Sequence, residues 1–363
     1  NEGLLGTKVK DVKIERSKFN STQFGFRLGG PIIKNKLFFF TNYEHTMGRE
    51  IASNFIAFSP GLTGDNVTRV LASDLNEISQ FLFDEYNYVT GPYQDIFLRN
   101  KSDKFLIKLD YNISDKHKLS VRYNQLTASS DQVPNNSRFF GAGDRFDNPN
   151  GMTFLNSGSK RNTNVYSFVA ELNSNFNSKF SNKFKIGYSY FPEDRSVNGN
   201  LFPSVDILQN GTTYISFGSD MFANNNVVNQ QILQIENDFS IFLNNHTITL
   251  GINYQSYKFK NVFTPAWQGS YVFNSLQDFY NSTPQGTQTP IGISNGIGRP
   301  SIYTRRFSGL ENGGIIFAKP KFSQTSFYTQ DKFDVSDNFR IVGGLRLDIT
   351  SFLNSPRKNL ELD

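Results

Sequence analysis

Apolar and polar residues alternate with a period of two along much of the chain. In residues 104–113 the odd positions are apolar, and the even positions are polar except for Leu106. Successive side chains of a β-strand point to opposite faces, so this pattern predicts a strand with one apolar and one polar face. A helix does not fit, because helical spacing would place Lys108 beside Phe105 and Leu109.

The same alternation recurs and predicts about ten strands. They are expected near residues 23–29, 37–45, 103–113, 118–125, 165–176, 179–191, 231–243, 246–260, 324–335 and 339–350. The adjacent rings of Phe38, Phe39 and Phe40 hide the alternation in one of them. Phe39 is the ring we expect to face outward there, although the pattern leaves the parity open.

The connections between these strands alternate between short and long. Short turns are expected at residues 30–36, 114–116, 177–178, 244–245 and 336–338, and long polar connections at roughly 46–102, 127–164, 192–230 and 261–323. Long structureless connections argue against a compact soluble domain. In a transmembrane β-barrel they are normal, because periplasmic turns are short and extracellular loops are long.

The chain is therefore expected to be all-β, a transmembrane antiparallel β-barrel domain over residues 1–363 that forms part of a larger barrel. A closed ten-stranded barrel is the alternative, and it would require the strand at Gln23 to pair with the strand at Phe339. A secreted β-sandwich is disfavoured, because its turns recur every 8 to 12 residues or so.

Composition narrows the function classes. The 363 residues include 37 phenylalanines and 16 tyrosines but no cysteine, which excludes disulfides and thiolate chemistry. No run approaches the roughly 20 apolar residues of a membrane-spanning helix. The net charge of +5 is spread without a dense basic block, so nucleic acid is not an expected partner.

Two segments resemble a known family. Residues 25–44, "GFRLGGPIIKNKLFFFTNYE", and residues 326–349, "SFYTQDKFDVSDNFRIVGGLRLDI", resemble TonB-dependent outer-membrane receptors of the Oar-like, carboxypeptidase-regulatory-like group of Bacteroidetes. The match is specific at residues 29–40, 328–331 and 344–348. The resemblance implies a Gram-negative outer-membrane location and active transport, with this chain supplying barrel wall and ligand-capturing surface loops.

The resemblance also implies parts that this sequence does not show, namely a plug domain and an N-terminal extension. We therefore expect an internal piece of a longer receptor. The implied partners are outer-membrane lipid and TonB, which acts through the plug; a surface lipoprotein or secretion-system subunits are further candidates. A passive or secretion-associated outer-membrane barrel and a soluble β-rich surface adhesin remain the alternatives.

Candidate functional residues fall into two groups. Charged residues on the polar side of the predicted strands would face the lumen or the plug: Arg27, Lys108, Asp110, Arg122, Glu171, Lys185, Glu236, Asp238, Arg340, Arg346 and Asp348. Aromatic residues in the long connections could stack on a substrate: Tyr86, Tyr88, Tyr93, Trp267, Tyr271 and Tyr280.

No catalytic constellation or cofactor motif is present, so we do not expect an enzyme. The loop "GDRFDNPNG", residues 143–151, contains Asp144 and Asp147 and is a weak calcium candidate. Its spacing departs from that of the Asp-rich calcium loops, so a solvated turn is favoured.

Overall fold

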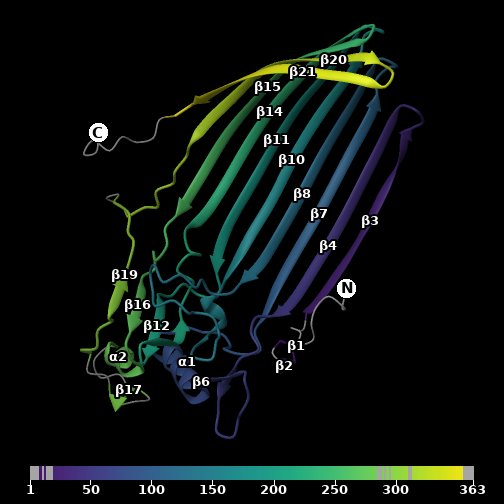
Figure 1. Ribbon diagram of the computed structural model, residues 1–363. Helices are drawn as coiled ribbons and strands as arrows, with labels where there is room; N and C mark the ends of the chain where they lie inside the picture. Colours follow the sequence, from purple (N-terminus) through teal and green to yellow (C-terminus); the bar gives the residue numbers. More distant parts are fainter. Residues whose placement is uncertain are drawn as a thin grey trace.

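The computed structural model describes residues 8–9, 12–13, 19–283, 288–289, 292–293, 296–309 and 313–354. A long sheet dominates the molecule and leads at one end into a smaller folded region (Figure 1). None of the helices within these residues is long and apolar enough to cross a membrane.

Ten antiparallel strands form the long sheet, and each pairs with its neighbours in chain order, β3-β4-β7-β8-β10-β11-β14-β15-β20-β21. Their bounds are β3 (Phe19–Ile33), β4 (Leu37–Ile51), β7 (Phe97–Asn112), β8 (His117–Gln132), β10 (Ser159–Asn175), β11 (Phe180–Val197), β14 (Asn226–Leu243), β15 (His246–Phe263), β20 (Lys321–Ser336) and β21 (Phe339–Phe352). The predicted all-β antiparallel class is confirmed. The closed ten-stranded alternative is not formed, because β3 and β21 lie at opposite edges of the sheet (Figure 1).

The strands are longer than the alternation predicted, mainly at the end joined by long connections, which we call the loop end. β10 begins at Ser159 and β11 continues to Val197, about six residues beyond the predicted bounds in each case. The added residues 159–164 of β10 and 192–197 of β11 are polar on both faces except for Pro192 and Val197, so the apolar-polar contrast that marks a strand is lost there.

The opposite, turn end is closed by tight hairpins. The turn expected over residues 30–36 is shorter than predicted, because β3 continues to Ile33 through a β-bulge next to Pro31. A bulge tolerates proline, which cannot donate to a regular ladder. Asn35, with a φ of 59°, then reverses the chain before β4.

Register divides the sheet into two chemically different faces. Phe39 lies opposite Leu109, whereas Phe38 and Phe40 lie opposite Asp110 and Lys108. We call the face of Phe39 and Leu109 the outer face, and the face of Lys108 and Asp110 the inner face. Phe39 is thus the outward ring, and its two neighbours point inward.

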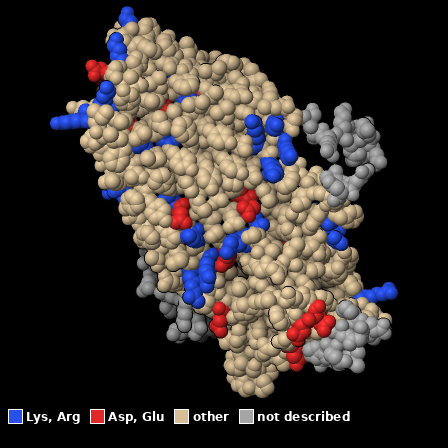
Figure 2. All heavy atoms as spheres, turned by 180° about the vertical axis from the view of Figure 1, so that it is seen from behind, with Lys and Arg blue, Asp and Glu red and all other residues tan. Residues whose placement is uncertain are grey.

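The outer face exposes many large apolar side chains, including Phe105, Ile107, Leu109, Phe168, Tyr188, Leu250, Ile252, Phe327 and Leu347. They come from β7, β10, β11, β15, β20 and β21, and the intervening β8 and β14 place apolar side chains such as Val121, Leu233 and Ile235 on the same face. Figure 2, viewed from behind, shows uncharged atoms over most of the strands and charged side chains nearer the smaller folded region. Contiguous apolar surface of this kind requires a covering medium other than water.

The long connections fold together into one structure, which we call the cap: the described parts of residues 52–96, 133–158, 198–225 and 264–309. Its helices are α1 (Ala72–Tyr86), α2 (Leu276–Asn281) and the 3-10 helix η2 (Leu155–Ser157). Its strands are β5 (Ile56–Phe58), β6 (Val67–Leu71), β9 (Met152–Thr153), β12 (Ser204–Gln209), β13 (Thr212–Phe217), β16 (Ser270–Phe273) and β19 (Ile302–Thr304). Strands from different connections pair in the order β19-β16-β12-β13-β9.

The cap has its own hydrophobic core, with residues from every long connection. They include Leu75, Ile78, Leu82, Tyr88, Phe154, Ile207, Tyr214, Ile215, Phe217, Phe273, Phe279 and Tyr280. The expectation of structureless loops was therefore wrong. Each connection is too short and polar to bury a core alone, but several together can do so.

Helix α1 shows how the cap is assembled. Leu75, Ile78 and Leu82 are buried and recur three and four residues apart, which places them on one side of the helix. The helix ends at Asn87, whose left-handed backbone lets its N–H bond the last helical turn.

Three further two-stranded pairings complete the described structure: β5 with β6, β1 (Lys8–Val9) with β2 (Val12–Lys13), and β17 (Gln288–Thr289) with β18 (Gly292–Ile293).

Candidate functional site

All the charged residues that the sequence assigned to the channel wall lie on the inner face. Residues directly opposite each other on neighbouring strands share a face, which allows the inner face to be followed from strand to strand. Lys108 lies opposite Arg122, and Lys185 lies opposite both Glu171 and Glu236. The full set on this face is Arg27, Lys108, Asp110, Arg122, Glu171, Lys185, Glu236, Asp238, Arg340, Arg346 and Asp348.

Opposite charges neutralise one another over the middle of this face. Lys185 Nζ lies 2.9 Å from Glu236 Oε1, and Lys108 Nζ lies 2.8 Å from Asp110 Oδ2. Glu236 also accepts a hydrogen bond from the side-chain amide of Asn253, at 3.1 Å. These side chains form a satisfied polar surface instead of isolated charges.

Tyr328 is the centre of a second cluster, on β14, β20 and β21. Its hydroxyl donates to Asp238, and the Arg346 guanidinium lies 5.4 Å from the centre of its ring. Arg346 in turn donates to Asp348 at 2.9 Å and to Ser326 at 2.8 Å. The cluster thus joins the segment of residues 326–349 to β14, across β15.

Gly251 makes room for this cluster. It lies opposite both Asp238 and Tyr328, and a Cβ placed on it would come within 2.0 Å of the Tyr328 ring. A larger residue would displace the ring and its bond to Asp238. The glycine is therefore required by a close approach and not by an unusual backbone angle.

Three arginines of the inner face differ in their surroundings. Arg340 pairs with Asp334 near the turn end. For Arg27 and Arg122, no carboxylate partner is found in the part of the chain that the structure describes. These two guanidinium groups are inner-face cations that are open to an additional partner.

The loop aromatics separate into buried and accessible residues. Tyr88 is 2% exposed and Tyr280 1% exposed, both inside the cap core. These two are corrections to the substrate-contact prediction, because a ring enclosed by its own protein cannot stack on a ligand. Sequence alone could not separate them from their neighbours, since the long connections showed no sign of a shared core.

The other rings are accessible in part. Tyr86 is 40% exposed, and Tyr93, Trp267 and Tyr271 are half-buried. Tyr271 also lies against Tyr303, with ring centres 4.7 Å apart. These side chains stay candidates for contact with a substrate.

A buried ion pair ties two connections of the cap together. Arg145 donates to Asp206 through Nε at 2.8 Å and through Nη2 at 3.0 Å, and Asp206 is fully buried. The same carboxylate accepts from the Ser216 hydroxyl at 2.9 Å and from the Ala142 N–H at 2.8 Å. All its lone pairs have donors, as a buried charge requires.

Arg69 links three connections. Its guanidinium donates to the Asn150 carbonyl at 2.8 Å and to the Gln209 side chain at 2.8 Å, and it lies over the Tyr214 ring. The Tyr214 hydroxyl donates to Asp74 at 2.8 Å, and burial raises the pKa of Tyr214. The cap is therefore held by directional contacts as well as by its core.

The weak calcium candidates have protein partners. Asp144 pairs with Arg138 at 2.9 Å, and Asp147 accepts the Thr153 N–H at 2.9 Å. Burial raises the pKa of Asp147 to about 6. Within the described ranges, no group of three or more His, Asp or Glu side chains could hold a metal ion.

Tyr328 was noted from the sequence as part of the family resemblance but not as a candidate functional residue, and Arg69, Arg145 and Asp206 were not singled out at all. Tyr328 could have been found, because it occupies a polar-side position of a predicted strand. The other three lie in connections without periodicity. Their partners are distant in sequence, and no local signal marks them.

The whole chain matches one family. A family model described as "Outer membrane beta barrel domain" matches residues 7–362. No functionally curated protein matches the sequence.

Several solved structures are similar. The siderophore receptor PirA from Acinetobacter baumannii is 14% identical, with a TM-score of 0.49, over 93% of this chain and 37% of that one. FpvA from Pseudomonas aeruginosa is 12% identical, with a TM-score of 0.49, over 93% of this chain and 37% of that one. The ferric-catecholate import receptor Fiu from Escherichia coli K12 is 12% identical, with a TM-score of 0.46, over 92% of this chain and 47% of that one. The chain spans less than half the length of each of these proteins.

Proposed function

Because the chain belongs to the outer membrane β-barrel domain family and lies in the outer membrane of a Gram-negative bacterium, we propose that it is part of a TonB-dependent active importer. It supplies about half of the barrel wall and a folded cap that captures the ligand. Its inner face lines a hydrated lumen, and its outer face contacts lipid. It performs no covalent chemistry.

The cluster around Tyr328 is the observation that supports the proposal most directly. The residues by which the chain resembles Oar-like receptors include Tyr328, Arg346 and Asp348, and these three side chains meet on the inner face. A sequence motif whose members converge on the lumen wall points to a task inside the barrel. In the Oar-like group that task is to face a plug.

The inner-face charges then have distinct roles. Paired residues such as Lys185 and Glu236 form the hydrated wall. Arg27 and Arg122 are the groups that bind plug carboxylates or carbonyls in the closed state. Ion pairs of this kind break at modest cost in water, which suits a plug that TonB must move.

The cap is the proposed ligand-capturing surface. A folded cap holds its accessible rings in fixed positions, which lowers the entropy lost when a ligand binds. Tyr86, Tyr93, Trp267 and Tyr271 are the proposed contacts. A surface lipoprotein, if the complete receptor recruits one, would act at this same end.

Additional strands are required to close the wall. Among the described residues, β3 and β21 each pair on one side only. Unpaired backbone groups are costly in lipid, so strands from the rest of the receptor must cover both edges. The plug and the TonB-contacting segment would belong to that same remainder.

Two measurements on the full-length gene product test active import. In a planar lipid bilayer the protein should show no steady conductance, because the plug closes the lumen. The periplasmic domain of TonB, used as the probe, should bind the purified protein. A steadily conducting channel that ignores the TonB domain would instead identify a passive barrel.

A variant experiment tests the inner-face roles. Arg27→Gln combined with Arg122→Gln should raise the frequency of brief conductance events, because the plug loses two contacts. Lys319→Gln combined with Lys321→Gln removes the same charge at the loop end of the sheet, away from the lumen-lining positions. This control should leave the frequency of conductance events unchanged. An equal frequency of conductance events in the two double variants would show that Arg27 and Arg122 do not contact the plug.

A further inference from the structure

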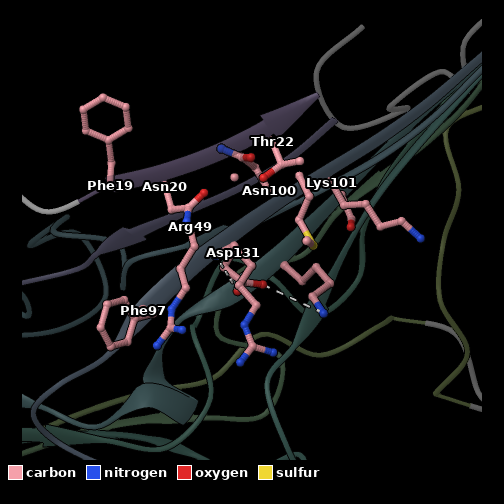
Figure 3. A pocket seen from close by; sticks show the side chains of 13 residues that line it. Phe19, Asn20, Thr22, Arg49, Phe97, Asn100, Lys101 and Asp131 are labelled. Carbon is pink, nitrogen blue, oxygen red and sulfur yellow. Dashed lines mark hydrogen bonds and ion pairs between the residues drawn. The ribbon is translucent and has the colours of Figure 1, made fainter. Parts of the chain in front are cut away.

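A pocket of about 610 Å³ lies at the loop end of β3, β4, β7, β8 and β10. Its lining includes the cations Arg49, Arg99, Lys101 and Lys160 and a single acidic residue, Asp131. Figure 3 shows the labelled Arg49, Lys101 and Asp131 around the pocket, with the Lys101 side chain extending away from Arg49 and Asp131. None of these residues belongs to the inner-face clusters or to the cap.

Register places the cations on the outer face. Arg49 lies opposite Arg99, and Lys101 lies opposite Met47. Lys160 lies opposite Asp131 on the adjoining pair of strands. Along β7 the outer-face positions continue from Arg99 and Lys101 through Asp103 to Phe105, Ile107, Leu109 and Tyr111.

The pocket therefore lies directly beyond the apolar surface. Lys101 and Phe105 are four residues apart on β7, a separation of about 13 Å along the strand. The cations are thus at the level where a membrane changes from acyl chains to headgroups. Because β7 enters the cap connections at this end, the leaflet concerned is the outer one.

The two arginines are placed at an energetic cost. Like charges directly opposite each other on an antiparallel pair are destabilising. In the described part of the chain neither Arg49 nor Arg99 has a carboxylate partner for its guanidinium. On the inner face, by contrast, Lys108 also faces Arg122, but Asp110 lies 2.8 Å from Lys108.

Two of the four cations have carboxylate partners, Lys101 with Asp103 and Lys160 with Asp131, whereas local contacts hold the two arginines without neutralising them. The Arg49 guanidinium lies 3.6 Å from the centre of the Phe97 ring, and the two side chains lie side by side in Figure 3. Asp131 accepts the backbone N–H of Arg99 at 3.0 Å and lies 3.8 Å from Lys160 Nζ. Lys101 lies 3.5 Å from Asp103, and its side chain is 57% exposed.

A second cationic pair occurs at a matching position farther around the sheet. Lys258 lies opposite Lys321 on the outer face, at the loop ends of β15 and β20. Lys260 follows on the same face, over the Phe317 ring at 4.3 Å. Basic side chains thus recur around the outer wall at one level.

We propose that Arg49, Arg99, Lys101 and Lys160 form a binding site for the phosphate groups of a phosphorylated lipid of the outer leaflet. Planar guanidinium groups bind phosphate oxygens in a bidentate manner, and phosphate would relieve the repulsion between the two arginines. The acyl chains of the same lipid would lie against Phe105 and Ile107. This site does not depend on active transport, and it would serve a passive barrel equally.

Binding of defined lipids to the full-length protein in detergent tests the site. The probes are lipid A with both phosphates, the same lipid after enzymatic removal of the phosphates, and inorganic phosphate as competitor. The wild type should bind the phosphorylated lipid more tightly than the dephosphorylated one. Arg49→Gln with Arg99→Gln should weaken binding of the phosphorylated lipid at least about tenfold.

The controls keep the test decisive. Arg27→Gln with Arg122→Gln removes the same charge from the inner face and should change lipid affinity less than about twofold. Arg49→Lys with Arg99→Lys keeps the charge and should retain part of the affinity. Heat-dependent gel mobility identifies variants whose barrel has folded.

Three results would overturn the proposal. Equal binding of the two lipids by the wild type would exclude phosphate recognition. Equal loss in the inner-face variant would exclude this pocket. If inorganic phosphate displaces the lipid at a comparable concentration, the site binds free anions and is not specific for a lipid.

Discussion

Among the described residues, the buried charged side chains are Arg145, Asp206 and Asp220 of the cap, and Asp206 is the clearest case. The Arg145–Asp206 pair is almost completely buried, so removal of one partner leaves the other charge without compensation. We expect Asp206→Ala to lower the stability of the cap by about 3–5 kcal/mol. Limited proteolysis of the cap in denaturant measures the change.

An exposed ion pair of the same region is the matched control. Arg138 and Asp144 pair at 2.9 Å, but their side chains are 74% and 38% exposed. Asp144→Ala should therefore cost about 1 kcal/mol or less. Similar losses in the two variants would contradict the importance of burial.

Asp147 makes the cap sensitive to pH. Burial raises its pKa from 3.8 to about 6, so the folded cap binds this proton more tightly than the unfolded cap does. The stability of the cap should therefore fall as the pH rises from about 4 to about 6 and stay lower above that range. Burial raises the pKa of Asp220 as well, which adds a slope of the same sign.

Asp147→Asn should flatten the part of this slope that Asp147 contributes and stabilise the cap at neutral pH. Thermal unfolding at several pH values between about 4 and 8 measures how the stability of the cap depends on pH. A wild-type cap whose stability rises over that pH interval would contradict the assignment.

A substitution at Leu250 tests which face of the sheet contacts lipid. It lies on the outer face of β15, between His246 at the turn end and Lys258 at the loop end, and is 47% exposed. An arginine on the lipid side at this depth should cost about 2–4 kcal/mol of folding free energy in a bilayer. Gln234→Arg, on the inner face of the neighbouring β14, should cost clearly less. Equal folding of Leu250→Arg and wild type in vesicles would refute the register.

At the level of elements, helix α1 contributes Leu75, Ile78, Phe81 and Leu82 to the core of the cap. Ile78 is fully buried against residues from the other connections, so Ile78→Ala should cost about 2–5 kcal/mol of cap stability. Phe83→Ala, on the same helix, removes a ring that is 49% exposed and should have a much smaller effect. The rate of proteolysis within residues 198–225, a different connection, reads out the loss, because all the connections share one core.

The strands and the cap elements differ in how far sequence predicts them. Each long strand contacts two different media, and the alternation records that contrast over the segment between the headgroups. Beyond that segment the pattern fades, which is why Ser159 and Val197 were not included in β10 and β11. α1 was missed because its short apolar stripe lies within a polar connection of more than fifty residues.

For the whole molecule, the arrangement of turns and cap predicts sidedness. An epitope inserted at Gly211, in the turn between β12 and β13, should be accessible to antibody on intact cells, because a side chain there would meet open space. An epitope at Asp337, in the turn between β20 and β21, should be accessible only after the outer membrane is permeabilised. Labelling of Asp337 on intact cells would reverse this orientation.

The sequence by itself determined what depends on neighbouring positions along the chain. Alternation of apolar and polar residues assigned the strands, their antiparallel order and the side of the sheet on which Lys108 and Arg122 lie. A strand turns alternate residues to opposite faces, so this information is local. The parity at Phe38, Phe39 and Phe40 required the neighbouring strand, because adjacent rings carry no local contrast.

Only the tertiary structure decided which distant residues meet. It enclosed Tyr88 and Tyr280 in the cap, paired Arg145 with Asp206, and brought Arg49 opposite Arg99 on the outer face. Each of these contacts joins residues that lie far apart in the chain. Their formation depends on a shared core and on strand register, and neither is encoded in a short stretch of sequence.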